Sequence, residues 1–248
     1  MKKIYFLIIT ILLFQSFQAQ SDQKGKSPAS KVFSADAVID KQYGVNMYQP
    51  LNMMLGGDTV RNDVNGYAAN GYIQDFYTTG QLLHKGFYVD GLLKVYKNYF
   101  PNGQVERNFR MVDLKKSKMT IYYKEGGIKS NIVYVHSEAL KWEDFYPNGL
   151  VEFVEEYDKD FQYYMHKANY YENGTPENEL VLDNKKKLLY TQTYYHPNGK
   201  IKEQGEMRYN KAEFDYEKLG TWMLYDESGK ATKSQKYASG QVVSEKNL

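Results

Sequence analysis

A seven-residue motif recurs along most of the chain: an aromatic pair, two turn-forming residues, a glycine, any residue and an aliphatic residue. Seven glycines mark the copies: Gly80, Gly103, Gly126, Gly149, Gly174, Gly199 and Gly229. Successive marking glycines are separated by 23, 23, 23, 25, 25 and 30 residues. Such regular spacing is the signature of a repeat architecture, in which each copy packs on its neighbours in the sequence.

The turn residues predict that each copy is a β-hairpin. Three copies carry Pro-Asn-Gly, as in Pro101-Asn102-Gly103. Proline fixes φ at the first turn position, asparagine tolerates left-handed geometry, and glycine adopts positive φ without a Cβ clash. A unit of about 23 residues has no room for the helical crossover of about a dozen residues that parallel strands require. We therefore expect antiparallel hairpins, seven in number, with about 14 strands.

The columns of the repeat predict the two faces of the sheet. Strand side chains alternate between faces, so the residues three and seven before each glycine share one face, and the ring four before it lies on the other. The ring four before the glycine occurs in all seven copies, which indicates an architectural position. Because both faces carry rings, the predicted fold class is all-β: tandem antiparallel β-hairpin repeats forming an elongated, twisted single-layer sheet.

The rings three residues before the glycines are the candidate binding face. They are Tyr77, Phe100, Tyr123, Tyr146 and Tyr171. Exposed aromatic rings offer a large rigid contact area to sugars, peptides or another sheet. The alternative is that these rings only hold adjacent hairpins together.

The amino terminus has the features of a signal peptide. Lys2 and Lys3 precede an apolar run at residues 4–14, which is too short for a spanning helix. We expect residues 1–20 to be removed before Ser21; a buried helix or a retained anchor is the alternative. The remaining divisions are a flexible linker at 21–45, a cap segment at 46–65 and the hairpin array at 66–248. The expected protein is exported (periplasmic, cell-surface or secreted), with no membrane span after signal removal.

Charge and composition exclude several kinds of function. The formal net charge of +2 includes Lys2 and Lys3, and residues 1–20 contain no Asp or Glu, so the remainder is close to neutral. A neutral chain lacks the one-signed field that nucleic-acid binding needs. The absence of cysteine excludes thiolate nucleophiles and cysteine zinc sites. The four histidines lack metal-ligand spacing, so we expect no catalytic residue, no cofactor and no metal site.

Two pairs of adjacent acidic residues were considered as glycosidase carboxylates, Glu143-Asp144 and Glu155-Glu156. Glycoside hydrolysis needs two carboxylates that flank one bond. Neighbouring residues on a strand point to opposite faces, so neither pair is expected to converge on a substrate.

Two copies carry a family resemblance, Tyr195-His196-Pro197-Asn198-Gly199-Lys200-Ile201 and Phe145-Tyr146-Pro147-Asn148-Gly149. The unit resembles the MORN-variant repeat of the YwqK-type antitoxin family, over roughly residues 66–243. Gly220-Thr221-Trp222 is similar to the strand that often precedes the next turn in that family. The family's name implies binding of a toxin partner.

The sequence therefore favours a non-catalytic, exported repeat protein that binds an unidentified protein or glycan. An inhibitor of a co-exported toxin is the first alternative, and a carbohydrate-directed enzyme is the second. A pocket with convergent carboxylates or a metal would favour the enzyme, whereas a flat ribbon would favour the scaffold.

Overall fold

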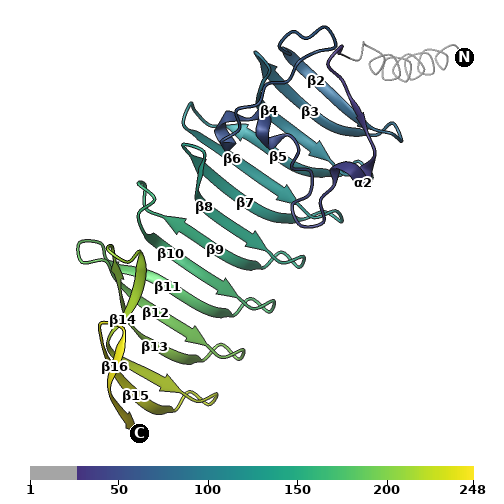
Figure 1. Cartoon of the computed structure of the whole chain (residues 1–248). Helices are drawn as coiled ribbons and strands as arrows, with labels where there is room; N and C mark the ends of the chain where they lie inside the picture. Colours follow the sequence, from purple (N-terminus) through teal and green to yellow (C-terminus); the bar gives the residue numbers. More distant parts are fainter. Residues whose placement is uncertain (1–26) are drawn as a thin grey trace, which may run out of the picture.

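The structure, a computed structural model, describes residues 27–248, so the predicted signal peptide at residues 1–20 lies outside it. The described chain forms one 16-stranded sheet in which the strand order follows the sequence (Figure 1). The strands are β1 (Val32–Phe33), β2 (Gly71–Tyr77), β3 (Leu82–Val89), β4 (Leu92–Tyr99), β5 (Val105–Met111), β6 (Lys116–Tyr122), β7 (Ile128–Val135), β8 (Glu138–Phe145), β9 (Val151–Tyr157), β10 (Tyr164–Tyr170), β11 (Pro176–Asn184), β12 (Leu189–Tyr195), β13 (Ile201–Asn210), β14 (Asp215–Tyr225), β15 (Ala231–Ala238) and β16 (Gln241–Asn247). Only β1 and β2 pair in parallel; all other neighbours are antiparallel.

The seven predicted hairpins are all present. Each marking glycine lies between two paired strands, from Gly80 between β2 and β3 to Gly229 between β14 and β15. All seven glycines have positive φ, between 82° and 99°, a conformation in which a Cβ would be strained. The sheet is open and elongated, and the predicted fold class is confirmed.

The two faces of the sheet differ in what covers them. Ile73, Asp75 and Tyr77 of β2 are at most 1% exposed, whereas Tyr72, which alternates with them, is 68% exposed. We call the side of Ile73 the cap-facing side and the side of Tyr72 the open face. Ile73 and Tyr77 stand seven and three residues before Gly80, so their common side confirms the predicted parity.

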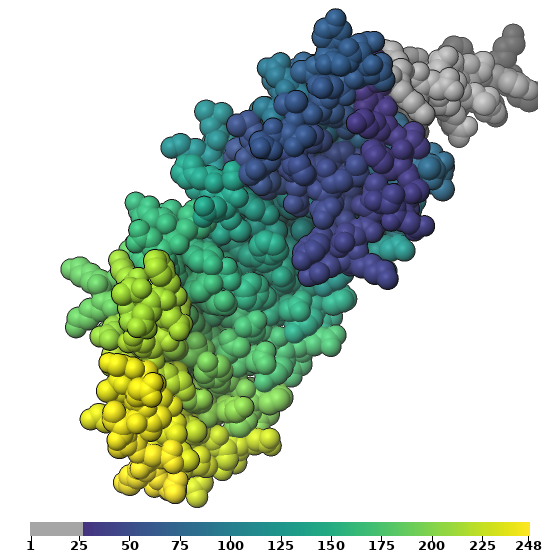
Figure 2. Space-filling model, in the orientation of Figure 1, coloured from purple at the N-terminus to yellow at the C-terminus, as the bar shows by residue number. Residues whose placement is uncertain are grey.

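Residues 27–70 form a cap over one end of the sheet, seen in purple and dark blue in Figures 1 and 2. The cap contains β1, the short helix α2 (Ala35–Val38) and two 3-10 turns, η1 (Gln49–Leu51) and η2 (Met53–Leu55). Residues 27–45 of the cap belong to the segment predicted as a linker, and Ala29, Val38 and Val45 within them are buried. None of the described helices is long and apolar enough to cross a membrane.

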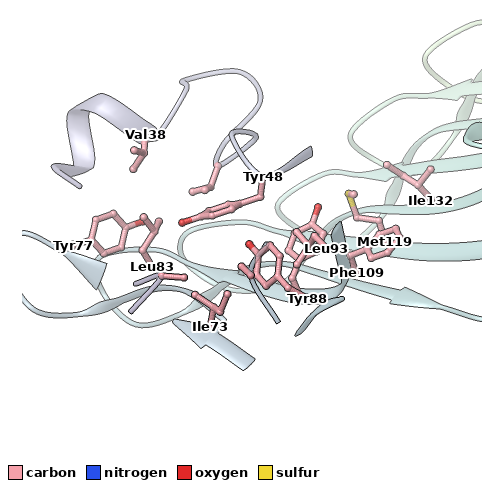
Figure 3. Packing of buried hydrophobic residues seen from close by; sticks show 14 residues of the cluster. Val38, Tyr48, Ile73, Tyr77, Leu83, Tyr88, Leu93, Phe109, Met119 and Ile132 are labelled. Atoms are coloured by element: carbon pink, nitrogen blue, oxygen red, sulfur yellow. The ribbon is translucent and has the colours of Figure 1, made fainter. Parts of the chain in front are cut away.

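Two clusters of buried apolar side chains stabilise the array. Beneath the cap, Val38 and Tyr48 pack against Tyr77, Leu83 and Tyr88 of the sheet (Figure 3), and the cluster continues through Phe109 and Met119 to Ile132. A second cluster further along the sheet is made of Tyr163, Leu180, Leu188 and Tyr190. The region of the sheet between the two clusters borders the candidate site.

Candidate functional site

Rings three residues before the glycines link successive hairpins. The hydroxyl of Tyr123 donates a hydrogen bond to the backbone oxygen of Phe145, 2.5 Å away, in the next hairpin. Tyr77, Tyr146 and Tyr171 do the same toward Tyr99, Tyr170 and Tyr195, and His196 Nε2 lies 3.0 Å from the oxygen of Tyr225. The acceptor is in each case the residue four before the next glycine, so this column joins adjacent hairpins, which is the alternative role that the sequence left open.

The turn asparagines provide a second link. Asn148 Oδ1 accepts a hydrogen bond from the backbone N–H of Leu150, which closes its own turn, while its Nδ2 donates to the oxygen of Glu172 in the next turn. Asn102, Asn173 and Asn198 make the equivalent pair of bonds. Between hairpins two and three, where Phe100 has no hydroxyl, Asn102 provides this side-chain link in addition to the pairing of β5 with β6.

The five candidate binding rings differ in their surroundings. Tyr77 is buried beneath the cap. Phe100 and Tyr123 come together at the edge of a groove, whereas Tyr146 and Tyr171 lie further along the array. The hydroxyls of the four tyrosines are all used within the protein, so ligand binding through their ring faces stays a prediction.

A buried polar network holds the cap on the sheet. Asp75 accepts hydrogen bonds from both terminal nitrogens of Arg61, at 2.6 and 2.7 Å, and from the hydroxyl of Tyr48 at 2.7 Å. Burial alone would raise the pKa of Asp75, but the Arg61 guanidinium outweighs it and holds that pKa below its usual value. A second pair lies nearby: Arg107 bonds Glu106 and donates to the oxygen of Tyr43 in the cap.

His84 lies at the centre of this network. The ring of Tyr48 stacks on it at 3.7 Å. Its Nδ1 lies 2.7 Å from Asn98 Oδ1, and its Nε2 lies 2.9 Å from the hydroxyl of Tyr88. An amide oxygen can only accept, so Nδ1 carries the proton and Nε2 accepts from Tyr88. Burial lowers the pKa of His84 to about 4, which makes it a neutral structural residue.

A groove of about 760 Å³ opens where the cap ends. Its floor is the cap-facing side of β6 to β8, with Met119 and Ile132 buried and Tyr134 and Trp142 partly buried. One wall is the cap loop at residues 39–46, and the other is the turn at residues 122–125. The size falls within the range of pockets for small ligands.

Three polar side chains converge in this groove. Asp144 Oδ1 accepts hydrogen bonds from Trp142 Nε1 at 2.7 Å and from Ser130 Oγ at 2.5 Å. Both bonds use Oδ1, so Oδ2 has no hydrogen bond to any residue within 27–248. An aromatic surface beside an oriented carboxylate is suited to a polar ring or to a peptide side chain.

The groove residues were only partly visible in the sequence. Trp142 stood in the bulky column seven before the glycine, but nothing distinguished it from its structural counterparts. In the sequence, Asp144 stands out only as half of an adjacent acidic pair, and Ser130 carries no signal. The sequence does not give the pairing register of β7 with β8, and it is this register that places Ser130 opposite Asp144.

The adjacent acidic residues diverge as expected. Glu155 lies 3.6 Å from Lys167, whereas Glu156 lies 4.0 Å from Lys141. Asp144 faces the groove, but Glu143 bonds Lys141 at 3.1 Å on the open face. Among residues 27–248, no group of three or more His, Asp or Glu side chains is placed to hold a metal ion.

Comparisons with known proteins support the repeat type. Residues 191–208 match the family described as MORN repeat variant, so the chain carries a MORN-variant repeat. This segment contains the Tyr195-His196 turn and parts of β12 and β13. No curated protein matches the chain.

Two solved structures resemble parts of the sheet. A TarM mutant of S. aureus, in complex with Fondaparinux, alpha-GlcNAc-glycerol and UDP, is 16% identical over 40% of this chain and 19% of that one, with a TM-score of 0.27. The TcdB2-TccC3-Cdc42 complex is 10% identical over 75% of this chain and 12% of that one, with a TM-score of 0.23. This chain thus spans less than a fifth of either, and these likenesses carry no functional argument.

Proposed function

We propose that this protein is an exported, non-catalytic repeat scaffold that binds a protein or glycan in the groove between the cap and the sheet. The observation that carries the proposal is the oriented group of Trp142, Asp144 and Ser130 above an apolar floor. Small-ligand sites have this character, since a few fixed polar groups stand within a mainly apolar surface.

The carboxylates around the groove support binding rather than hydrolysis. Glu106 is bound to Arg107, and Asp40 accepts hydrogen bonds from the backbone of its own turn at Gln42 and Tyr43. Glu125 also lines the groove, as an exposed residue of the turn that forms one wall. Asp144 is the carboxylate that hydrogen bonds orient over the floor, whereas glycoside hydrolysis needs two carboxylates that flank one bond.

Affinity capture from the producing cells tests this proposal. The full chain and its Trp142→Ala and Asp144→Asn variants are used as baits, with partners identified by mass spectrometry. We expect a partner that the parent retains, that Trp142→Ala loses and that Asp144→Asn weakens. Phe214→Ala is the matched control, because Phe214 is an exposed loop ring outside the groove. Equal retention by all four baits would contradict the groove as the site.

A toxin partner is the second candidate function, and it rests on the resemblance of the repeat copies at residues 145–149 and 195–201 to the YwqK-type antitoxin family. Co-expression with each neighbouring open reading frame tests it. The proposal expects one neighbour to be toxic alone and harmless in the presence of the parent chain.

Export rests on Lys2 and Lys3 followed by the apolar run at residues 4–14. Intact-mass analysis of the natural protein should find an amino terminus near Ser21. Recovery of the full-length chain from the cytosol would contradict export.

A further inference from the structure

The open face carries a groove of its own, about 640 Å³ in volume, over β2 to β5. Its lining includes Tyr72, Gln74, Lys85, Lys97, Asn108 and Arg110. The cap covers the opposite side of these strands, so this groove and the one at Trp142 are separate sites.

Four cations follow one another across consecutive strands of the open face. They are Lys85 on β3, Lys97 on β4, Arg110 on β5 and Lys118 on β6, and all four are exposed. The register places Lys85 directly opposite Lys97 and Arg110 directly opposite Lys118. Like charges directly opposite each other destabilise a sheet, so the fold itself gains nothing from this arrangement.

No carboxylate neutralises these cations. The groove lining contains no Asp or Glu, and none of the four cations forms an ion pair with any residue that the structure describes. Asp75, on the same strands, is buried on the cap-facing side against Arg61. Further along the open face the pattern changes, since Lys141 pairs with Glu143 and Glu156. The four cations on β3–β6 are thus unpaired, whereas Lys141 on β8 is paired.

Rings and amides accompany the cations. Tyr72 is 68% exposed, its ring packs beside Phe87 at 5.0 Å, and Lys85 Nζ lies 5.8 Å from its centre. Tyr99 lies on the same face, and Gln74 and Asn108 present amides opposite Lys85 and Lys97, respectively. Rings pack on the faces of sugars, amides bond hydroxyls, and cations bind carboxylates.

We propose that this groove binds a linear acidic polysaccharide that carries a carboxylate on each sugar. Lys97 lies opposite Asn108, so the step from Lys97 to Arg110 is diagonal and about 7–8 Å long. Adjacent strands are about 4.8 Å apart, and this interval separates Lys85 from Lys97 and Arg110 from Lys118. This interval is comparable with the length of one sugar ring in an extended chain. A polyuronate lying obliquely across the strands would therefore present two successive carboxylates to Lys85 and Lys97, and a later pair to Arg110 and Lys118.

The charge of the whole chain separates this ligand from nucleic acid. The formal net charge is only +2, and four cations neutralise few phosphates. Nucleic-acid binding depends on many such contacts, so it would be weak here at physiological salt. A second copy of the chain is also a poor occupant, because Glu143 and Glu156 of the open face are already paired with Lys141.

Calorimetric titration of the full chain with a galacturonate hexamer tests the proposal. A neutral hexamer of the same length, a single-stranded oligonucleotide of equal charge and anionic vesicles are the comparison probes. We expect the galacturonate hexamer to bind best, with an affinity that decreases as salt rises. The double variant Lys97→Gln/Arg110→Gln should bind it about tenfold more weakly or worse, because two charge-assisted contacts are lost.

Matched variants keep the result interpretable. Lys185→Gln removes an exposed cation outside the groove and should bind like the parent. Lys97→Gln should melt at or above the parental temperature, because it removes a like-charge pair, which excludes misfolding as the cause of lost binding. Equal binding by the double variant and the parent would overturn the proposal. So would stronger binding of the neutral hexamer, the oligonucleotide or the vesicles, or salt-sensitive self-association through this face.

Discussion

The tyrosine three residues before a turn glycine connects two hairpins through one hydrogen bond. Its acceptor is a backbone oxygen of the following hairpin, so the link depends on how closely the hairpins stack. The column ends at Asp226, which bonds Ser228 and Lys230 within its own turn. The residue three before the glycine is thus a hydrogen-bonding side chain where a hairpin is linked to the next one, and it is replaced where these links end. This distribution indicates an architectural role.

Removing one such hydroxyl should destabilise the array. Tyr146→Phe deletes the bond to Tyr170 and should lower the free energy of unfolding by about 1 kcal/mol. Tyr122→Phe is the matched control, because the Tyr122 hydroxyl has no hydrogen-bond partner among residues 27–248. Urea unfolding measures both variants. Equal losses in the two would mean that the inter-hairpin bond contributes nothing.

His84 makes attachment of the cap sensitive to pH. Its ordinary pKa of 6.5 falls to about 4 in the folded protein. The unfolded chain therefore binds the proton more readily, and stability is complete above pH 6.5 and decreases as the pH falls toward 4. Asp75, whose pKa lies below its usual value, adds a further loss only at lower pH.

The expected loss between pH 6.5 and 4 is about 3 kcal/mol, since each pKa unit corresponds to about 1.4 kcal/mol. Peptide-resolved hydrogen exchange detects this loss of stability as faster exchange of the backbone amides of residues 27–70 when the pH is lowered. His84→Gln, which cannot titrate, should be less stable at pH 7 but should lose the excess pH dependence. An unchanged pH slope in His84→Gln would refute this assignment.

At the scale of an element, the longest hairpin illustrates how one strand shapes its neighbour. Trp222 of β14 is fully buried, its ring lies over Gly205 of β13, and its Nε1 donates to the oxygen of Glu206. Lys218 Nζ lies 3.8 Å from the ring centre. The pairing of the two strands is interrupted at Gly205, between Gln204 and Glu206, which is where the ring needs space.

A methyl group at Gly205 should break this packing. The added Cβ would lie 2.3 Å from the Trp222 ring, so Gly205→Ala should cost about 1–3 kcal/mol of stability through overpacking. Thermal melting monitored by circular dichroism gives the change. Gly205→Ala should cost less stability when it is added to Trp222→Leu than when it is added to the parent, because leucine leaves space for the new methyl group. Strictly additive losses would contradict a clash between the two.

The hairpins were predictable because their signals are local. Turn chemistry at Pro101-Asn102-Gly103 and period-two alternation act within one unit, so the seven hairpins and the sides of Ile73 and Tyr77 follow from the sequence. The polar network of Asp75 and the groove at Asp144 were not predictable. Both depend on which side chains from distant segments meet, and a carboxylate in a strand has the same sequence pattern whether it is solvated or buried.

The row of cations on the open face was missed for a similar reason. Lys97 stands six residues before Gly103, between the ring columns, and its position in the repeat does not indicate a binding role. Its partner Lys85 lies on the preceding strand, outside the column of Lys97. Only the pairing register places the two opposite each other.

At the scale of the whole molecule, each strand pairs only with its sequence neighbours. Stability is then a sum of hairpin and nearest-neighbour contributions, without one central core. The cap interrupts this uniformity, because it buries one end of one face and creates a groove at its border. The two grooves lie on opposite faces, so a single sheet offers two separate binding surfaces.

Small-angle X-ray scattering tests the extended stack most directly. Sixteen strands at about 4.8 Å spacing give a stack of about 72 Å, so we expect a radius of gyration above about 20 Å. The distribution of interatomic distances should be asymmetric, with a long tail. A compact domain of this chain length would have a radius of gyration of about 18 Å and a symmetric distribution, and that result would contradict the extended single-layer sheet.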